Sequence, residues 1–156
     1  MKTYELDERG NPSPEACREV AACINRAIEK YPEVELDMNE SRVNYHDHPC
    51  GTTHCHAGLF LIGCDNSEYE HVGVGYGYGV KLMIKMLGFG SCKLLLEWAQ
   101  INHVLWGNND GYWMFSGSDA FNEAETPSKI AEWWEAVADR IEVYNKEMDQ
   151  QQEGTL

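Results

Sequence analysis

Cys50–Gly63, with the sequence CGTTHCHAGLFLIG, is the stretch that decides the fold. A turn at its start leads into an apolar run that ends at a glycine, which is the pattern of a short buried helix. Four of its residues share one helical face: Cys55, Gly58, Leu59 and Ile62. The sequence therefore predicts a central buried helix that starts near Cys55, with Thr52 or Thr53 as its N-cap.

Helical patterns also flank this stretch on both sides. Ser13 followed by Pro14 predicts the start of a first helix that ends at Pro32, since Ser is a good N-cap and Pro fits the first helical position. Further amphipathic segments cover residues 80–87, 91–106 and 127–144. We therefore expect an all-α, single compact domain of about five or six helices.

The domain boundaries follow from the polar ends of the chain. Residues 1–12 are polar and rich in turn formers, and they predict a flexible arm. The helical domain is expected to span residues 13–146, followed by a frayed tail at 147–156. A chain of 156 residues is the size of one ordinary domain.

The formal net charge of −14 bears on the partners. A field of this sign repels phosphate backbones, so we expect no direct binding to nucleic acid. The sequence starts without the apolar stretch of a secretory signal, and no run reaches the roughly 18–20 apolar residues of a membrane span. These features predict a cytoplasmic protein with no membrane partner, located in the host cytoplasm if the chain is encoded by a phage.

The order of short motifs resembles that of a set of small, uncharacterised bacterial and phage helical proteins. Their motif Cys-Gly-Thr-x-x-Cys-x-Ala-Gly matches Cys50–Gly58, and shorter pieces match Leu36-Asp37-Met38, Leu87-Gly88-Phe89, Met114-Phe115 and Thr126-Pro127. The chain departs from the pattern at His56 and in the Gly/Tyr-rich segment 73–79. The resemblance implies an all-helical domain and brings no activity with it.

Histidines and cysteines gather just before the central helix. His46, His48, Cys50 and His54 offer the imidazole and thiolate ligands that zinc prefers in a tetrahedral site. No second Cys-x-x-Cys or His-x-x-x-His completes a finger elsewhere in the chain. We predict no cofactor, with zinc at these four residues as the alternative.

Cys55 is a second candidate for chemistry. A thiol at a helix N-terminus is stabilised as thiolate, and neighbouring histidines would serve as its base. The competing interpretation, which we favour, has the cysteines packed in the core and the histidines on the rim of a loop. The same interpretation makes Cys17 and Cys23 small core residues of the first helix.

The last helix carries an acidic solvent side made of Glu132, Glu135, Asp139 and Glu142. From Asp119 to Glu153 ten acidic residues stand against three basic ones. Together with Trp133 or Trp134 as exposed anchors, these carboxylates predict binding to the basic surface of a host protein.

We therefore expect a non-catalytic interaction protein, such as a phage-type inhibitor of the DNA-mimic, anti-CRISPR or antirestriction kind, which is an analogy of charge and size. The first alternative is a zinc- or thiol-dependent enzyme centred on residues 46–56. The second is a structural or assembly protein. The sequence leaves open the identity of the partner, any substrate, the oligomeric state and the role of segment 73–79.

Overall fold

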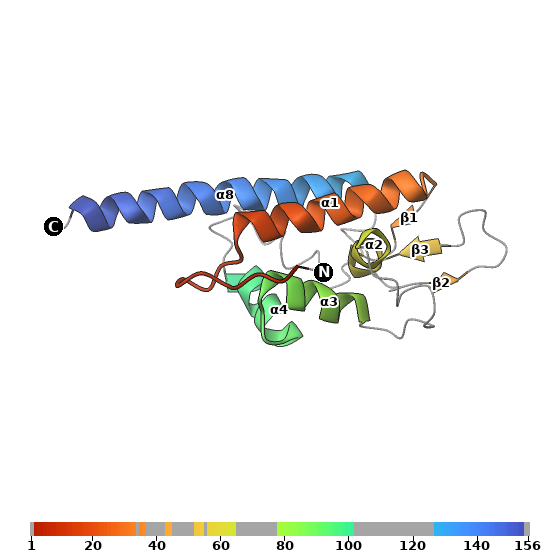
Figure 1. Cartoon of the computed structure of the whole chain (residues 1–156), viewed down its shortest axis with the longest axis horizontal. Helices are drawn as coiled ribbons and strands as arrows, with labels where there is room; N and C mark the ends of the chain where they lie inside the picture. Colours follow the sequence, from red (N-terminus) through yellow and green to blue (C-terminus); the bar gives the residue numbers. More distant parts are fainter. Residues whose placement is uncertain are drawn as a thin grey trace.

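The architecture is that of a computed structural model, which describes residues 2–33, 35–36, 43–44, 52–54, 56–64, 78–101 and 127–154. Within these ranges lie five helices: α1 (Pro14–Lys30), α2 (His56–Gly63), α3 (Tyr78–Leu87), α4 (Cys92–Ile101) and α8 (Pro127–Gly154). Helices dominate this part of the chain, as Figure 1 shows, and the predicted all-α class is confirmed.

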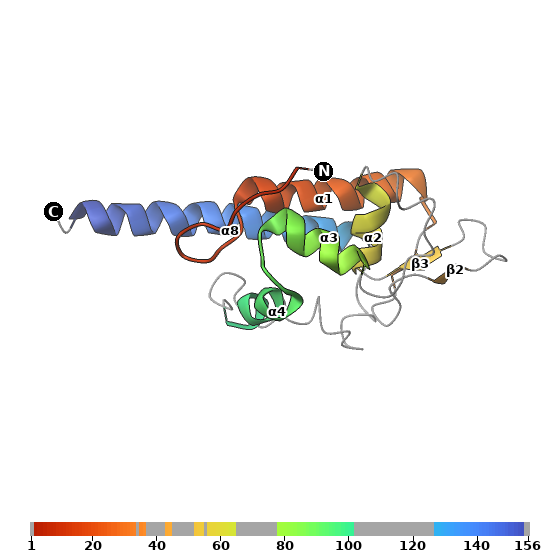
Figure 2. The same ribbon diagram turned by 60° about the horizontal axis from the view of Figure 1, so that its bottom comes forward.

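Two long helices form one layer of the molecule. α1 and α8 lie side by side and run in opposite directions in both views (Figures 1 and 2). α2 and α3 pack beneath this pair, and α4 lies on the far side of α3. The last turns of α8 extend beyond the start of α1.

α1 begins where the sequence predicts. The Ala16 N–H donates to Ser13 Oγ at 3.1 Å, and Pro14 is the first helical residue. Its inner face is made of small and medium side chains that are fully buried or nearly so: Ala16, Cys17, Val20, Ala21, Cys23, Ile24 and Ala27. Small residues on this face let α2 and α8 approach closely.

α2 is the central buried helix. It starts at His56, one residue after the predicted position, and Leu59, Phe60, Leu61 and Ile62 are all buried. Removing each such side chain from water contributes about 1.5–3 kcal/mol, so this one short helix supplies a large share of the core.

The end of α2 lies directly on the backbone of α1. A Cβ placed on Gly63 would lie 1.5 Å from the carbonyl oxygen of Cys23, so no residue other than glycine fits this contact. Arg26 of α1 also binds the end of α2, since its Nε donates to the Gly63 carbonyl at 2.9 Å. Its Nη2 lies 2.9 Å from Glu19 on the same helix α1.

The segment before α2 is a strand, which corrects the prediction that Thr52 or Thr53 caps the helix. β3 (Thr52–His54) pairs in parallel with β1 (Glu35–Leu36) and antiparallel with β2 (Val43–Asn44). The sheet order is β1-β3-β2, with Thr53 opposite both Glu35 and Val43. With strands of two or three residues, this sheet is a minor addition to the helical fold.

Residues 2–12, which the sequence predicts as a flexible arm, contact the helices at several points. The Tyr4 N–H donates to the Met86 carbonyl at 2.9 Å. Asn11 is only 3% exposed, and its Oδ1 accepts from the Trp98 indole N–H at 3.0 Å. Gly88, with a φ of 97°, ends α3 in the left-handed region and gives the arm room to cross.

α8 is longer than predicted. It begins at Pro127, as the Thr-Pro pair indicates, but continues to Gly154 and includes eight of the residues expected in a frayed tail. Within the described ranges, no helix combines the length and the hydrophobicity needed to cross a bilayer.

Candidate interaction surface on helix α8

The acidic side of α8 is the candidate site that the structure describes most fully. Glu132, Glu135, Asp139 and Glu142, which we call the acidic stripe, follow one another at steps of three and four residues, so they lie along one side of the helix. All four residues are exposed. The stripe predicted from the sequence therefore exists as one continuous surface.

The core fixes the direction of this stripe. A neighbouring flank of α8 is buried against the other helices through Ile130, Ala131, Trp134, Val137, Ala138 and Ile141. Burial of this apolar flank leaves α8 no freedom to rotate about its axis, because rotation would expose these side chains to water.

The C-terminal half of the stripe, Asp139 and Glu142, forms ion pairs with α1. Arg18 forms a fork, in which Nη2 lies 2.8 Å from Asp139 Oδ1 and Nη1 lies 2.6 Å from Glu142 Oε1. These hydrogen bonds, the stronger one to Glu142, raise the pKa of Arg18 above its ordinary value. The same fork lowers the pKa of Glu142 below its ordinary value of 4.5.

The N-terminal half of the stripe, Glu132 and Glu135, differs from the C-terminal half. Glu132 and Glu135 make no ion pair or hydrogen bond with another described side chain. Two of the four predicted contact residues therefore face solvent without a partner in this part of the chain, while the other two stabilise the pairing of α1 with α8.

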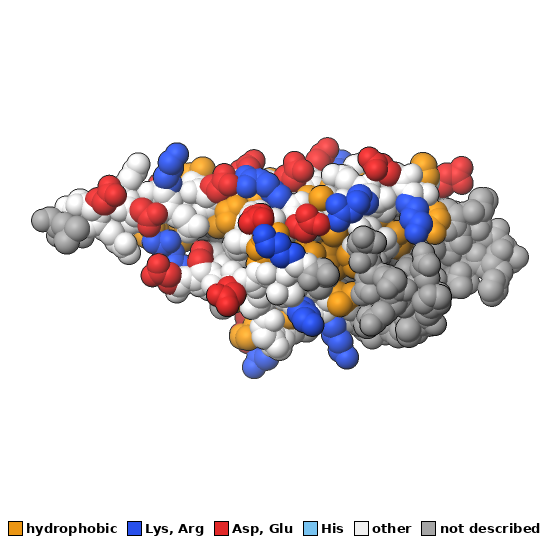
Figure 3. Space-filling model, viewed as in Figure 1, with side chains coloured by type: hydrophobic (Ala, Val, Ile, Leu, Met, Phe, Trp, Pro, Cys, Tyr) orange, Lys and Arg blue, Asp and Glu red, His pale blue; other side chains and the backbone are white. Residues whose placement is uncertain are grey.

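Both signs of charge occur on the face seen in Figure 3, where acidic and basic side chains alternate over α1 and the neighbouring part of α8. Ion pairs explain part of this pattern, since Lys2 lies 3.1 Å from Glu15 and Arg26 lies 2.9 Å from Glu19. On this face, acidic side chains are therefore interspersed with basic ones.

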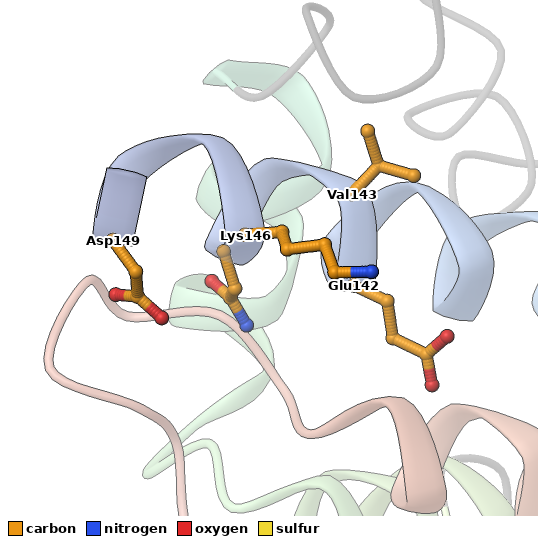
Figure 4. A pocket seen from close by; sticks show the side chains of 5 residues that line it. Glu142, Val143, Lys146 and Asp149 are labelled. Atoms are coloured by element: carbon orange, nitrogen blue, oxygen red, sulfur yellow. The ribbon is translucent and has the colours of Figure 1, made fainter. Parts of the chain in front are cut away.

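An open depression lies beside the second half of α8 (Figure 4). Its described lining residues are Glu142, Val143, Asn145, Lys146 and Asp149. Arg9 of the N-terminal segment reaches this area and donates to Asn145 Oδ1 at 3.2 Å and to Asp149 Oδ1 at 3.3 Å. The depression combines carboxylates, an ammonium group and an amide, which makes it a polar surface feature.

The two tryptophans do not act as the exposed anchors that we expected. Trp134 is fully buried, and this part of the prediction is wrong because residue 134 lies in the middle of the buried flank. Trp133 is partly buried, with its ring edge-on to Trp134 at a centroid distance of 5.0 Å and an angle of 83°. Both rings therefore serve the packing of the helix.

The predicted metal ligands lie mostly outside the described residues. This holds for His46, His48 and Cys50, while His54 is described only through its backbone in β3. In the ranges that the structure describes, no three His, Cys, Asp or Glu side chains form a group that could hold a metal ion. The zinc site therefore stays a prediction.

Three cysteines can be placed in the structure. Cys17, Cys23 and Cys64 are free thiols buried in the core. Loss of hydration raises the pKa of both Cys17 and Cys23 to about 12, which keeps these thiols protonated near neutral pH. The core role predicted for Cys17 and Cys23 is confirmed, whereas the nucleophile candidate Cys55 lies outside the described residues.

Comparison of the chain with protein-family models, with curated proteins and with solved structures gives no match. The resemblance based on the Cys-Gly-Thr motif therefore stays a prediction, and the function has to be argued from the chain itself.

Proposed function

We propose that this protein is a non-catalytic interaction protein that binds the basic surface of another protein through the N-terminal half of the acidic stripe. The observation that carries the proposal is the exposure of Glu132 and Glu135 on a helix fixed by its buried flank. A basic partner would pair with these carboxylates without first breaking an ion pair to another described residue.

The spacing of the charges supports a partner that normally binds nucleic acid. Adjacent carboxylates at three- or four-residue steps lie about 5–6 Å apart at their Cβ atoms. One strand of B-DNA carries a charge for about every 3.4 Å of axis. The carboxylates of α8 are therefore spaced more widely than the phosphates of one DNA strand, but they present the same sign of charge along one side of a straight helix.

The partner is expected to be a host protein whose basic groove binds phosphates, such as a DNA-cleaving nuclease. Electrostatic complementarity of this kind acts mainly on the rate of association and on specificity, and salt weakens it. Phage origin and inhibition belong to this proposal, by analogy with small acidic inhibitors.

The test is an inhibition assay with a panel of restriction endonucleases and RNA-guided nucleases acting on plasmid DNA. We expect inhibition of at least one enzyme, with an apparent inhibition constant that rises about tenfold or more when salt increases from 50 to 200 mM. Inhibition that does not respond to salt, or no inhibition across the panel, would contradict the proposal.

Two variants assign the effect to residues. E132K/E135K should raise the inhibition constant by about tenfold or more, since attraction becomes repulsion at the contact. E5K/E8K makes the same change in net charge on the exposed part of the N-terminal segment and serves as the matched control. Equal losses in the two variants would mean that net charge, and not the stripe, produces the inhibition.

A further inference from the structure

α8 has a third side, which points away from the core and adjoins the acidic stripe at Glu132. Residues at steps of four and three mark this outer face: Ala136, Arg140, Val143, Glu147 and Gln150. At 100° per residue, this face lies nearly opposite the buried flank. Four of its five members are exposed, and Ala136 is half-buried.

Val143 lies at the centre of the outer face. It is 56% exposed, and with Leu94 it is one of two large hydrophobic side chains found exposed in the described part of the chain. In Figure 4, Val143 projects from α8 in a different direction from Glu142 and Asp149. An apolar side chain in this position gains free energy if a partner covers it.

Two charges of opposite sign flank Val143. Arg140 lies three residues before it and Glu147 four residues after it, and neither makes an ion pair or hydrogen bond with another described residue. Seven residues of helix correspond to about 10.5 Å, so the two side chains are too far apart for a close ion pair. Each therefore lacks a partner of the opposite sign within this part of the molecule.

We propose that the outer face binds a second copy of this chain, with the two α8 helices antiparallel about a two-fold axis near Val143. In such an isologous contact, residue i meets residue j and residue j meets residue i. Val143 then meets its own counterpart, and Arg140 of each copy meets Glu147 of the other. A two-fold axis at the apolar Val143 requires a cation on one side of it along the helix and an anion on the other. Arg140 and Glu147 have this arrangement.

The ends of the contact fit the same arrangement. Ala136 lies opposite Gln150 of the second copy, and its small side chain lets the two helices approach closely. The face has the alternating steps of four and three of an antiparallel coiled-coil seam. Because the core lies on the other side of α8, the two domains project away from each other.

The size of this contact indicates weak association. From Ala136 to Gln150 the helix rises about 21 Å, which is too short for an interface of standard size. Each copy also carries a net charge of −14, which opposes dimer formation at low salt. We expect a dissociation constant of about 10⁻⁵ to 10⁻³ M in 150 mM salt.

Sedimentation equilibrium of the full chain, up to about 1 mM protein, tests the proposal through a charge swap. R140E and E147R should each weaken the dimer by about tenfold or more, because each places like charges opposite one another, and R140E/E147R should restore it to within about threefold. E147R is decisive, since it reduces the net negative charge. If general repulsion governed association, E147R would strengthen it.

A disulfide assay gives a second measurement. V143C should cross-link to its counterpart in mild oxidant, since the two-fold axis brings the two residues together, whereas wild type and E147C should not. Any of three results would overturn the proposal: a monomer at 1 mM, a dimer whose dissociation constant is unchanged by the charge swap, or equal cross-linking of V143C and E147C. The residues substituted in these tests are not part of the acidic stripe, so neither result decides the proposed function.

Discussion

The two halves of α8 have the same secondary structure for different physical reasons. In residues 127–141 the helix carries a continuous buried flank that includes Trp134 and Ile141. In residues 142–154 every residue is exposed or only partly buried, and polar contacts with the rest of the chain include those of Arg18 with Glu142 and of Arg9 with Asn145 and Asp149. The first half is stabilised by burial, and the second depends mainly on polar contacts and helix propensity.

Removal of the largest buried side chain should have the greatest effect on this contrast. Trp134→Ala is expected to lower the free energy of unfolding by about 3–5 kcal/mol, because it leaves a large cavity between α8 and the other helices. Urea denaturation followed by circular dichroism measures this change. A loss below about 1 kcal/mol would mean that the flank is not packed as described.

Two nearly adjacent substitutions place the boundary between the halves. Ile141→Ala, at a residue with 0% exposure, should cost about 2–4 kcal/mol. Val143→Ala, at a residue with 56% exposure, should change stability by less than about 0.5 kcal/mol, since alanine has the better helix propensity. Both are measured in dilute protein, and equal effects would contradict the boundary.

Truncation after Lys146 tests how much the second half contributes. The deletion removes one ion pair, Arg9 with Asp149, and the partly buried Met148, so we expect a loss of about 1 kcal/mol or less. Thermal unfolding of the truncated chain is the measurement. A loss above about 2 kcal/mol would show that residues 147–154 pack as firmly as the first half.

The smallest effect is expected from pH. The Arg18 fork depresses the pKa of Glu142 in the folded state, so its contribution is fully present above the unfolded pKa near 4.5 and is lost as the pH falls through the folded pKa. The difference in Tm between wild type and Glu142→Gln should thus be constant from pH 7 to about 5.5 and shrink below about 4.5. A difference that grows on acidification would contradict this assignment.

Local signals in the sequence were sufficient for the starts of the helices. Ser13 caps α1 and Ser91 caps α4, where the Leu94 N–H donates to Ser91 Oγ at 3.2 Å, both as their sequence positions indicate. The start of α8 at Pro127 was also predicted. These features depend on a few consecutive residues, so they can be deduced without knowledge of the tertiary structure.

Features that depend on distant residues were missed. The strand Thr52–His54 needs partners 8 to 18 residues earlier in the chain, and a turn-like sequence gives no sign of them. The engagement of Asp139 and Glu142 by Arg18 depends on the register of α1 against α8. The position of Arg18 beside the buried stripe of α1 was the available signal.

The end of α8 was missed for a different reason. Residues 147–153 contain Glu, Met and Gln, which are good helix formers, and no proline or glycine interrupts them before Gly154. The expectation of a frayed tail gave too much weight to the lack of apolar periodicity. Helix propensity alone was the better guide for this segment.

Gly63 offers a criterion for recognising relatives of this chain. Because its α-carbon faces the Cys23 carbonyl with no space for a side chain, the distance between α1 and α2 is set by a single missing methyl group. A homologue that keeps this helix junction must also keep glycine at the position equivalent to 63. A chain with any larger residue there would need a different crossing of the two helices, however similar its remaining sequence.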